Sequence, residues 1–283
     1  MTVAAVKARR AQSAPARIRR FVGRTGAFPF EVWRRVALSI AVGLTALWRM
    51  LWLRTWRPTV RQEFVRHCWQ VGIKALPTTV LTAVLVGAGL VFQVIYWQRD
   101  FGDVLSALNI NTLTVLILVR EIAPLLVGLI VIGRSATVMI TELVGLRAGG
   151  QVHMLDAQGI DVFDYLVVPR IAALAVCSFA LGVVFVLTAL VVGQLLATAA
   201  GTARFGLFEF LVNATRLLSP TEYLLLPLKT LSIGVLIGVV TCVTAMRPAE
   251  IGLDARELLP LGYMRAVVAT LILSGAITAA VVL

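Results

Sequence analysis

Residues 111–133 read NTLTVLILVREIAPLLVGLIVIG, and this stretch decides the class of fold. A helix needs about 20 residues, at about 1.5 Å each, to cross the roughly 30 Å hydrocarbon core of a bilayer. Runs of comparable apolar character occur at residues 75–97, 166–199, 222–246 and 265–283. Because a helix satisfies its own backbone hydrogen bonds in lipid, we expect an all-α integral membrane protein with five transmembrane helices.

The composition agrees with a membrane protein and excludes several classes of soluble enzyme. Hydrophobic residues make up 59% of the chain, charged residues only 14%, and the mean hydropathy is +0.93. No G-x-x-x-x-G-K-[ST] phosphate loop or H-E-x-x-H zinc motif is present, and His67 and His153 are far apart in the chain. We therefore expect no catalytic residue, metal site or cofactor in this chain.

The positive charge is concentrated at the N-terminus. The first 74 residues hold 15 of the 26 Lys and Arg residues but only two acids, Glu31 and Glu63. This distribution favours an anionic membrane surface over nucleic acid as the partner. It also predicts a cytoplasmic N-terminus and, with five spans, a C-terminus on the opposite side.

Residues 1–28 contain no acid and no sustained apolar periodicity, so we expect a disordered basic tail, although a transit peptide has a similar composition. Residues 29–56 bracket a short apolar stretch with Trp and Arg. This pattern is typical of an amphipathic helix in the membrane interface. The alternative is a sixth span, which would place the C-terminus inside.

Two charged residues, Arg120 and Glu121, lie near the middle of the second predicted span, and Lys229 lies within the fourth. Charges at such depth are costly unless they are paired or hydrated, so they indicate a functional site. Neighbours in sequence do not face each other on a helix, and each should therefore find its partner on another helix or on another subunit. Two alternatives remain: an Arg–Glu pair that only fixes helix packing, and a Lys229 that reaches the outer interface.

The segment between the second and third predicted spans, residues 134–165, is unusually long for a connection. With the N-terminus inside, it lies in the cytoplasm. Docking of a cytoplasmic partner is the expected role, and a re-entrant or surface helix that merely connects the spans is the alternative.

An ordered set of motifs resembles the MlaE/YrbE-type permeases, which are membrane subunits of ABC transporters that work with MCE-domain lipid-binding proteins. The match begins with Arg120-Glu121-Ile122-Ala123-Pro124 and Gly133-Arg134-Ser135-Ala136. It continues through Thr141-Glu142, Arg147, Gln151, Leu155, Asp161 and Pro169-Arg170. Gly87, Gln93 and Lys229 are similar to further family positions.

The resemblance implies a single permease domain over residues 29–283, with an interfacial helix, five spans and a cytoplasmic coupling helix between spans two and three. It implies a homodimer in a bacterial inner membrane. A cytoplasmic ATPase subunit would bind ATP and Mg²⁺, a small STAS-type regulator is a further possible partner, and a periplasmic MCE-domain protein would exchange lipid with the dimer. The expected cargo is phospholipid or another hydrophobic lipid, as in the maintenance of outer-membrane lipid asymmetry.

The resemblance also assigns roles to residues. The lipid path or its intramembrane charges would include Arg120, Glu121, Lys229, Gln93 and Gly87. The coupling helix, expected over residues 142–161, would present Glu142, Arg147, Gln151, His153, Leu155 and Asp161 to the ATPase. The structural motif residues would be Pro124, Gly133, Arg134, Pro169 and Arg170.

The sequence departs from the family pattern at several places. Gly149-Gly150 replaces a common Thr-Glu, which weakens the local helix. Val144 and Val162 stand where Gly and Pro are usual. These departures indicate a divergent paralogue. Two other functions remain open: a secondary transporter that couples ions or protons through Arg120 and Glu121, and a membrane anchor that recruits a partner through residues 134–165.

Overall fold

The computed structural model describes residues 33–34, 36–52, 56–100, 110–201, 206–217, 220–246 and 255–282. Five helical stretches are long and apolar enough to cross a membrane, which confirms the predicted all-α fold with five spans. They are Pro58–Tyr96, Thr114–Ala148, Phe163–Ala199, Glu222–Met246 and Leu258–Val281. The predicted basic tail, residues 1–28, lies outside the described residues.

The predicted N-terminal helix is present as a shorter apolar helix, Val36–Leu51, that is not among the five spans. At 1.5 Å per residue the described helix alone is too short to cross the hydrocarbon core. The choice between an interfacial helix and a sixth span over residues 29–56 stays a prediction. The chain divides into two compact units, Met1–Thr45 and Ala46–Leu283. The fold described below belongs to the second unit.

The first span has two parts. Helix α3 (Pro58–Val71) leads through a short 3₁₀ turn, η2 (Ile73–Ala75), into α4 (Leu76–Asp100). The prediction began this span at residue 75, because Arg61, Glu63 and Arg66 make α3 polar. The two helices join at Gly72, whose backbone closely approaches Cys177 of α10: a Cβ there would lie 3.1 Å from Sγ.

The second span continues further than predicted. It runs through α6 (Ile110–Ile117), the π-helical turn η3 (Leu118–Ile122), α7 (Ala123–Val131), the π-helical turn η4 (Ile132–Ala136) and α8 (Thr137–Ala148). The helix therefore continues past residue 133, where the predicted span ended. Gly133 and Arg134 widen the helix by a π turn without ending it, and buried Ile140 and Leu143 then hold α8 in the bundle.

The predicted coupling helix over residues 142–161 is interrupted. Helix α8 ends at Ala148, and Gly150 adopts a left-handed φ of 71° before the short helix α9 (Gln151–Ala157). Gly159, with a φ of 72°, follows α9. Only glycine adopts this conformation without steric cost, so the Gly149-Gly150 departure places the break.

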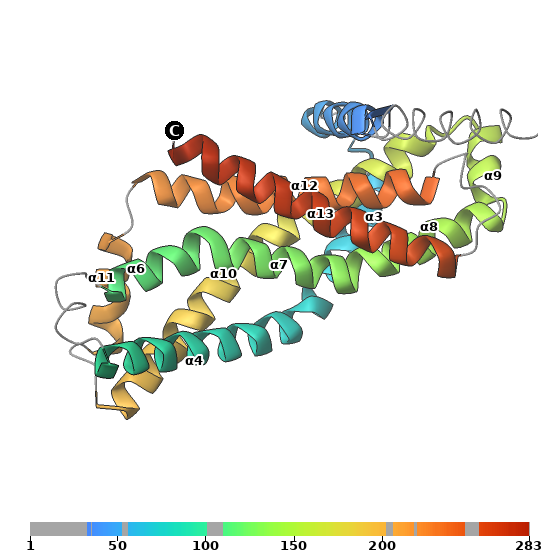
Figure 1. The fold of residues 1–283 in the computed structure, drawn as a ribbon. Coiled ribbons are helices and arrows are strands. Elements are labelled where there is room, and N and C mark those ends of the chain that lie inside the picture. Colours follow the sequence, from blue (N-terminus) through green and yellow to red (C-terminus); the bar gives the residue numbers. More distant parts are fainter. Residues whose placement is uncertain are drawn as a thin grey trace, which may run out of the picture. The chain divides into compact units, whose positions relative to one another are not determined.

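The third span forms the centre of the bundle. The π-helical turn η5 (Phe163–Val167) leads into α10 (Val168–Ala199), which packs against α12 (Pro220–Met246), α4 and α3. Helix α13 (Ala255–Val282) packs on α12 and α8, and Figure 1 shows α12 and α13 side by side. Glycine permits close contact: a Cβ on Gly234 of α12 would lie 2.6 Å from the Leu174 carbonyl oxygen of α10. Within the predicted outer loop 200–221, α11 (Leu207–Leu217) is helical.

Candidate functional site

Lys229, in α12, is the centre of a polar network between three spans. Its side chain is fully buried. Its ammonium donates hydrogen bonds to Glu121 Oε2 at 2.8 Å, to the Arg120 carbonyl oxygen at 3.0 Å and to Thr278 Oγ1 at 2.8 Å. The alternative in which Lys229 reaches the outer interface is therefore wrong, because all three donors are used inside the bundle.

The Arg120 carbonyl is available to Lys229 for a reason that lies in the sequence. In an α-helix this oxygen would accept from the backbone N–H four residues later, but residue 124 is proline, which has no N–H. The preceding turn η3 is π-helical, and the Ala123 N–H bonds to the Leu118 carbonyl. Pro124 thus leaves an acceptor in the apolar interior, and the buried ammonium of Lys229 satisfies it.

Thr278 of α13 connects the third helix to the network. Its hydroxyl lies 2.7 Å from Glu121 Oε1 and 3.0 Å from the Ser274 carbonyl, so its one proton goes to one of these two acceptors. Thr278 was not predicted as a site residue. The available signal was the spacing of Thr270, Ser274 and Thr278, four residues apart on one face of α13.

Arg120 and Glu222 form the second half of the network. An Arg120 guanidinium nitrogen lies 3.7 Å from Glu222 Oε1, and Arg120 Nε lies 3.9 Å from Glu121 Oε1. The prediction that each charge finds a partner on another helix is confirmed, since Arg120 pairs with Glu222 and Glu121 with Lys229. Arg120 Nη2 and Glu222 Oε2 are buried and, among the described residues, have no hydrogen-bond partner. Each of these two atoms therefore keeps an unused hydrogen-bonding capacity.

The other two lipid-path candidates contribute no described hydrogen bond or ion pair to this network. Gly87 lies at the α4–α10 contact, where a Cβ would come within 2.5 Å of the Ala189 carbonyl oxygen. Gln93 is exposed on α4. The structure thus gives Gly87 a packing role, and the role of Gln93 stays a prediction.

The coupling candidates on α8 make contacts inside the chain. Gln70 of α3 donates to Glu142 Oε1 at 2.5 Å, and Arg147 donates to the Ala245 carbonyl at the end of α12 at 2.8 Å. Both side chains hold α8 against neighbouring helices. On α9, in contrast, Gln151 and His153 are exposed and Leu155 is half-buried, and Figure 1 shows this short helix following α8.

Asp161 lies in a contact with Arg49 of the N-terminal helix. The guanidinium is 2.6 Å from Asp161 Oδ2 and 2.6 Å from Asp164 Oδ1, and it lies over the ring of Phe163. Hydrogen bonding to Arg49 lowers the pKa of Asp161. The bonds to Asp164 and Asp161 in turn raise the pKa of Arg49 above its ordinary value. Arg49 therefore fixes the turn that leads into α10.

The motif residues coincide with the π-helical turns. Pro124 and Pro169 each follow one, at the start of α7 and α10, and Gly133 and Arg134 lie within η4. Arg170 is buried and donates to the Leu166 carbonyl at 2.7 Å. Turns of this type are frequent at functional sites because they alter side-chain direction.

The family model described as Permease MlaE matches residues 64–282. The chain belongs to the MlaE permease family. The match begins within α3 and continues to the end of α13, so it includes every residue of the charge network.

Curated relatives of this permease agree with the assignment. A probable ABC transporter permease protein of Rickettsia felis is 27% identical over 192 residues, covering 65% of this chain and 70% of the relative. The chloroplastic protein TRIGALACTOSYLDIACYLGLYCEROL 1 of Arabidopsis thaliana is 25% identical over 213 residues, which cover 75% of this chain but only 57% of that protein. Membership of such a family implies an ATPase partner for the permease and a multi-pass membrane location.

Proposed function

We propose that this permease moves phospholipid or another hydrophobic lipid between the inner membrane and a periplasmic MCE-domain protein, driven by a separate cytoplasmic ATPase. The observation that carries the proposal is the network of Lys229, Glu121 and Thr278 with Arg120 and Glu222, set between apolar helices in a member of the MlaE family. The galactolipid in the name of the Arabidopsis relative supports a lipid as the cargo.

The network supplies the polar part of a lipid path. Arg120 and Glu121 have side chains 21% and 32% exposed, whereas Lys229 is fully buried. Arg120 is the more exposed of these two cations, and its Nη2, which is buried and has no hydrogen-bond partner among the described residues, is the proposed donor for a headgroup phosphate. Lys229 does not meet the phosphate in this proposal, and its role is to orient the carboxylate of Glu121.

Transport requires two arrangements of the spans, and closure of the ATPases would shift the balance between them. The α9 segment is the proposed contact with the ATPase, through Gln151, His153 and Leu155. Because Arg147 joins the end of α8 to the end of α12, a push on α9 would reach the helix that carries Lys229. Helix α12 carries both Lys229 and Glu222, so it belongs to both halves of the charge network.

The active unit is proposed to be a homodimer with its N-terminus in the cytoplasm and its C-terminus in the periplasm. Large apolar side chains on α4 and α13, among them Leu85 and Ile272, are more than half exposed in the single chain. Such surface suits contact with lipid or with a second copy. A small STAS-type regulator is a further proposed partner.

The decisive experiment is co-purification in mild detergent, followed by ATP-dependent transfer of labelled phospholipid from proteoliposomes. We expect an ATPase to co-purify and transfer to require ATP. Arg120→Ala and Glu121→Ala should lower transfer at least about tenfold without loss of expression, since each removes a charged contact. A monomer without an ATPase, or full transfer by both variants, would contradict the proposal.

A further inference from the structure

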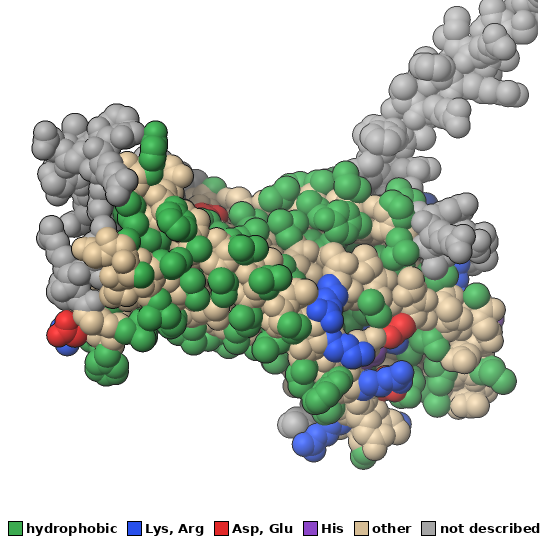
Figure 2. All heavy atoms as spheres, turned by 90° about the horizontal axis from the view of Figure 1, so that it is seen from below, with side chains coloured by type: hydrophobic (Ala, Val, Ile, Leu, Met, Phe, Trp, Pro, Cys, Tyr) green, Lys and Arg blue, Asp and Glu red, His purple; other side chains and the backbone are tan. Residues whose placement is uncertain are grey.

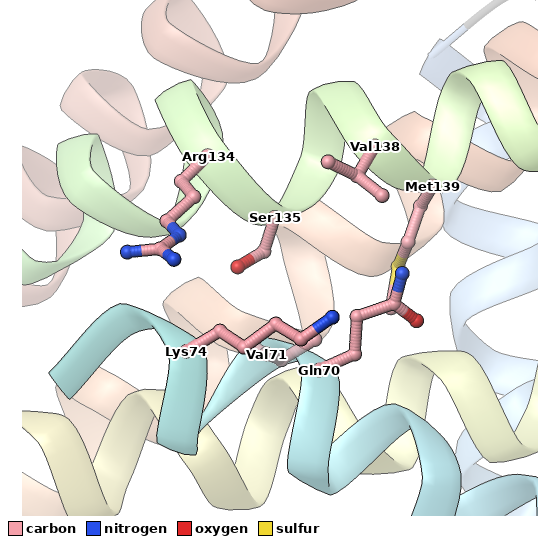
Figure 3. Close-up of a pocket in the computed structure, with 7 residues that line it drawn as sticks. All are labelled: Gln70, Val71, Lys74, Arg134, Ser135, Val138 and Met139. Atoms are coloured by element: carbon pink, nitrogen blue, oxygen red, sulfur yellow. The ribbon is translucent and has the colours of Figure 1, made fainter.

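A second polar site lies between the first and second spans. A cavity of about 150 Å³ separates α3 and η2 from η4 and α8. Its walls are formed by Gln70, Val71, Lys74, Arg134, Ser135, Val138 and Met139. Figure 3 shows Lys74 and Arg134 entering from opposite helices, with the hydroxyl of Ser135 directed toward the space between them.

The two cations of this cavity lack counter-charges among the described side chains. No described acid forms an ion pair with Lys74 or Arg134, although Arg49, Arg120 and Lys229 each have one. Gln70, which also lines the cavity, donates to Glu142 and so holds that carboxylate. Two cations with no described counter-charge at one cavity attract an anion.

Ser135 provides an independent indication of a ligand. Its residue is only 5% exposed, and its Oγ has no hydrogen-bond partner among the described residues. Burying a hydroxyl without a partner costs free energy, and native structures seldom tolerate it. A hydroxyl donor that lines the same cavity as an ammonium and a guanidinium completes a donor set suited to phosphate oxygens.

The position of the cavity indicates which phosphate it holds. Lys74 lies two residues before α4, and Arg134 immediately follows the apolar run 111–133, so both cations lie at the edge of a long apolar run. Trp69, Ile73 and Val138 nearby are 60%, 51% and 40% exposed. Exposed apolar side chains around a cationic cavity suit acyl chains and a headgroup together, and Figure 2 shows Lys and Arg gathered beside apolar surface.

We infer that Lys74, Arg134 and Ser135 bind the phosphate of an anionic phospholipid at the membrane interface. The inference rests on the proposed lipid transport and adds to it a site apart from the Arg120 network. Arg134 follows Arg120 by 14 residues on the same continuous helix, which is about 21 Å along its axis. The permease would therefore hold a headgroup at interface depth, well away from the network among the spans.

The test is native mass spectrometry of the full-length permease with phosphatidic acid and, separately, phosphatidylcholine of the same acyl chains. We expect phosphatidic acid to bind more tightly. Lys74→Gln with Arg134→Gln should weaken its binding at least about tenfold, and Ser135→Ala should weaken it several-fold, because charge-assisted hydrogen bonds are lost. The charge-conserving Lys74→Arg should keep binding and shows that the altered site still folds.

The matched control is Arg61→Gln with Arg66→Gln, which removes two exposed cations from α3 and should bind as the unaltered permease does. If the control double variant lost as much phosphatidic acid binding as the double variant of Lys74 and Arg134, the site would be overturned. Net charge alone would then explain the binding. Displacement of the lipid by equimolar inorganic phosphate would also overturn it and assign the cavity to free phosphate. Lipid binding at this site needs no ATPase, so the two proposals can fail separately. If ATP-dependent transfer fails while lipid binding still depends on Lys74 and Arg134, only the proposed function is contradicted.

Discussion

Lys229 shows how a charged residue is stabilised in an apolar bundle. Its three acceptors come from a carboxylate, a main-chain carbonyl and a hydroxyl, on two other helices. A buried cation without such partners would cost several kcal/mol. The residue therefore matters first for the arrangement of spans two, four and five, and only through that arrangement for the cargo.

Replacing Lys229 with Met should destabilise the permease by about 1–3 kcal/mol, because Glu121 loses its counter-charge while remaining partly exposed. Adding Glu121→Gln should recover part of the loss, since a neutral amide needs no counter-charge. Thermal unfolding in detergent, read as a double-mutant cycle, measures this coupling. Additive effects of the two substitutions would contradict the pairing.

Asp161 makes a pH-dependent contribution. Its pKa lies below the ordinary value of about 3.9 because Arg49 hydrogen-bonds to the charged form. The stabilisation is therefore fully present above that ordinary value and is lost as the pH falls through the lowered pKa. The rate of limited proteolysis within residues 149–162 should stay constant from about pH 8 to about pH 5 and should rise below about pH 4. Asp161→Asn should already show the higher cleavage at neutral pH.

Among the elements, the contact of α4 with α10 gives the clearest test of packing. Gly87→Ala would place a Cβ 2.5 Å from the Ala189 carbonyl and should force the helices apart, at a cost of about 1–3 kcal/mol. Gly89→Ala on the same helix is the matched control, because its Cβ would meet nothing within 4 Å. The midpoint of thermal unfolding should fall for the first variant and hold or rise for the second.

The elements also show what the sequence can predict. Long apolar runs locate the five spans because burial in lipid demands that composition. The π-helical turns and the extension of α8 escaped prediction, since Gly133 and Arg134 resemble the end of an apolar run. Arg120, Glu121 and Lys229 were found because a charge in such a run is conspicuous. Thr278 was missed because a single neutral hydroxyl is ordinary there, and its role depends on packing between distant segments.

For the whole molecule, the number of spans has a direct consequence. The five spans of the described residues predict that the two termini lie on opposite sides of the membrane, and the basic N-terminus should be the cytoplasmic one. A phosphatase reporter that is active only in the periplasm should be active when fused to the C-terminus. The same reporter should be inactive when fused to the N-terminus. Phosphatase activity at both ends or at neither would require an even number of crossings.

The four charged side chains of the network have a final consequence for energetics. Two cations and two anions, all in the described part of the chain, sum to zero. Moving one net charge through a potential of 100 mV changes the free energy by about 2.3 kcal/mol, but moving a neutral group changes it by almost nothing. Any motion that carries these side chains together is therefore insensitive to membrane voltage. The electrical gradient of the cell would neither drive nor oppose the motion of these four side chains, whereas an anionic lipid moved with them would still carry its own charge through the field.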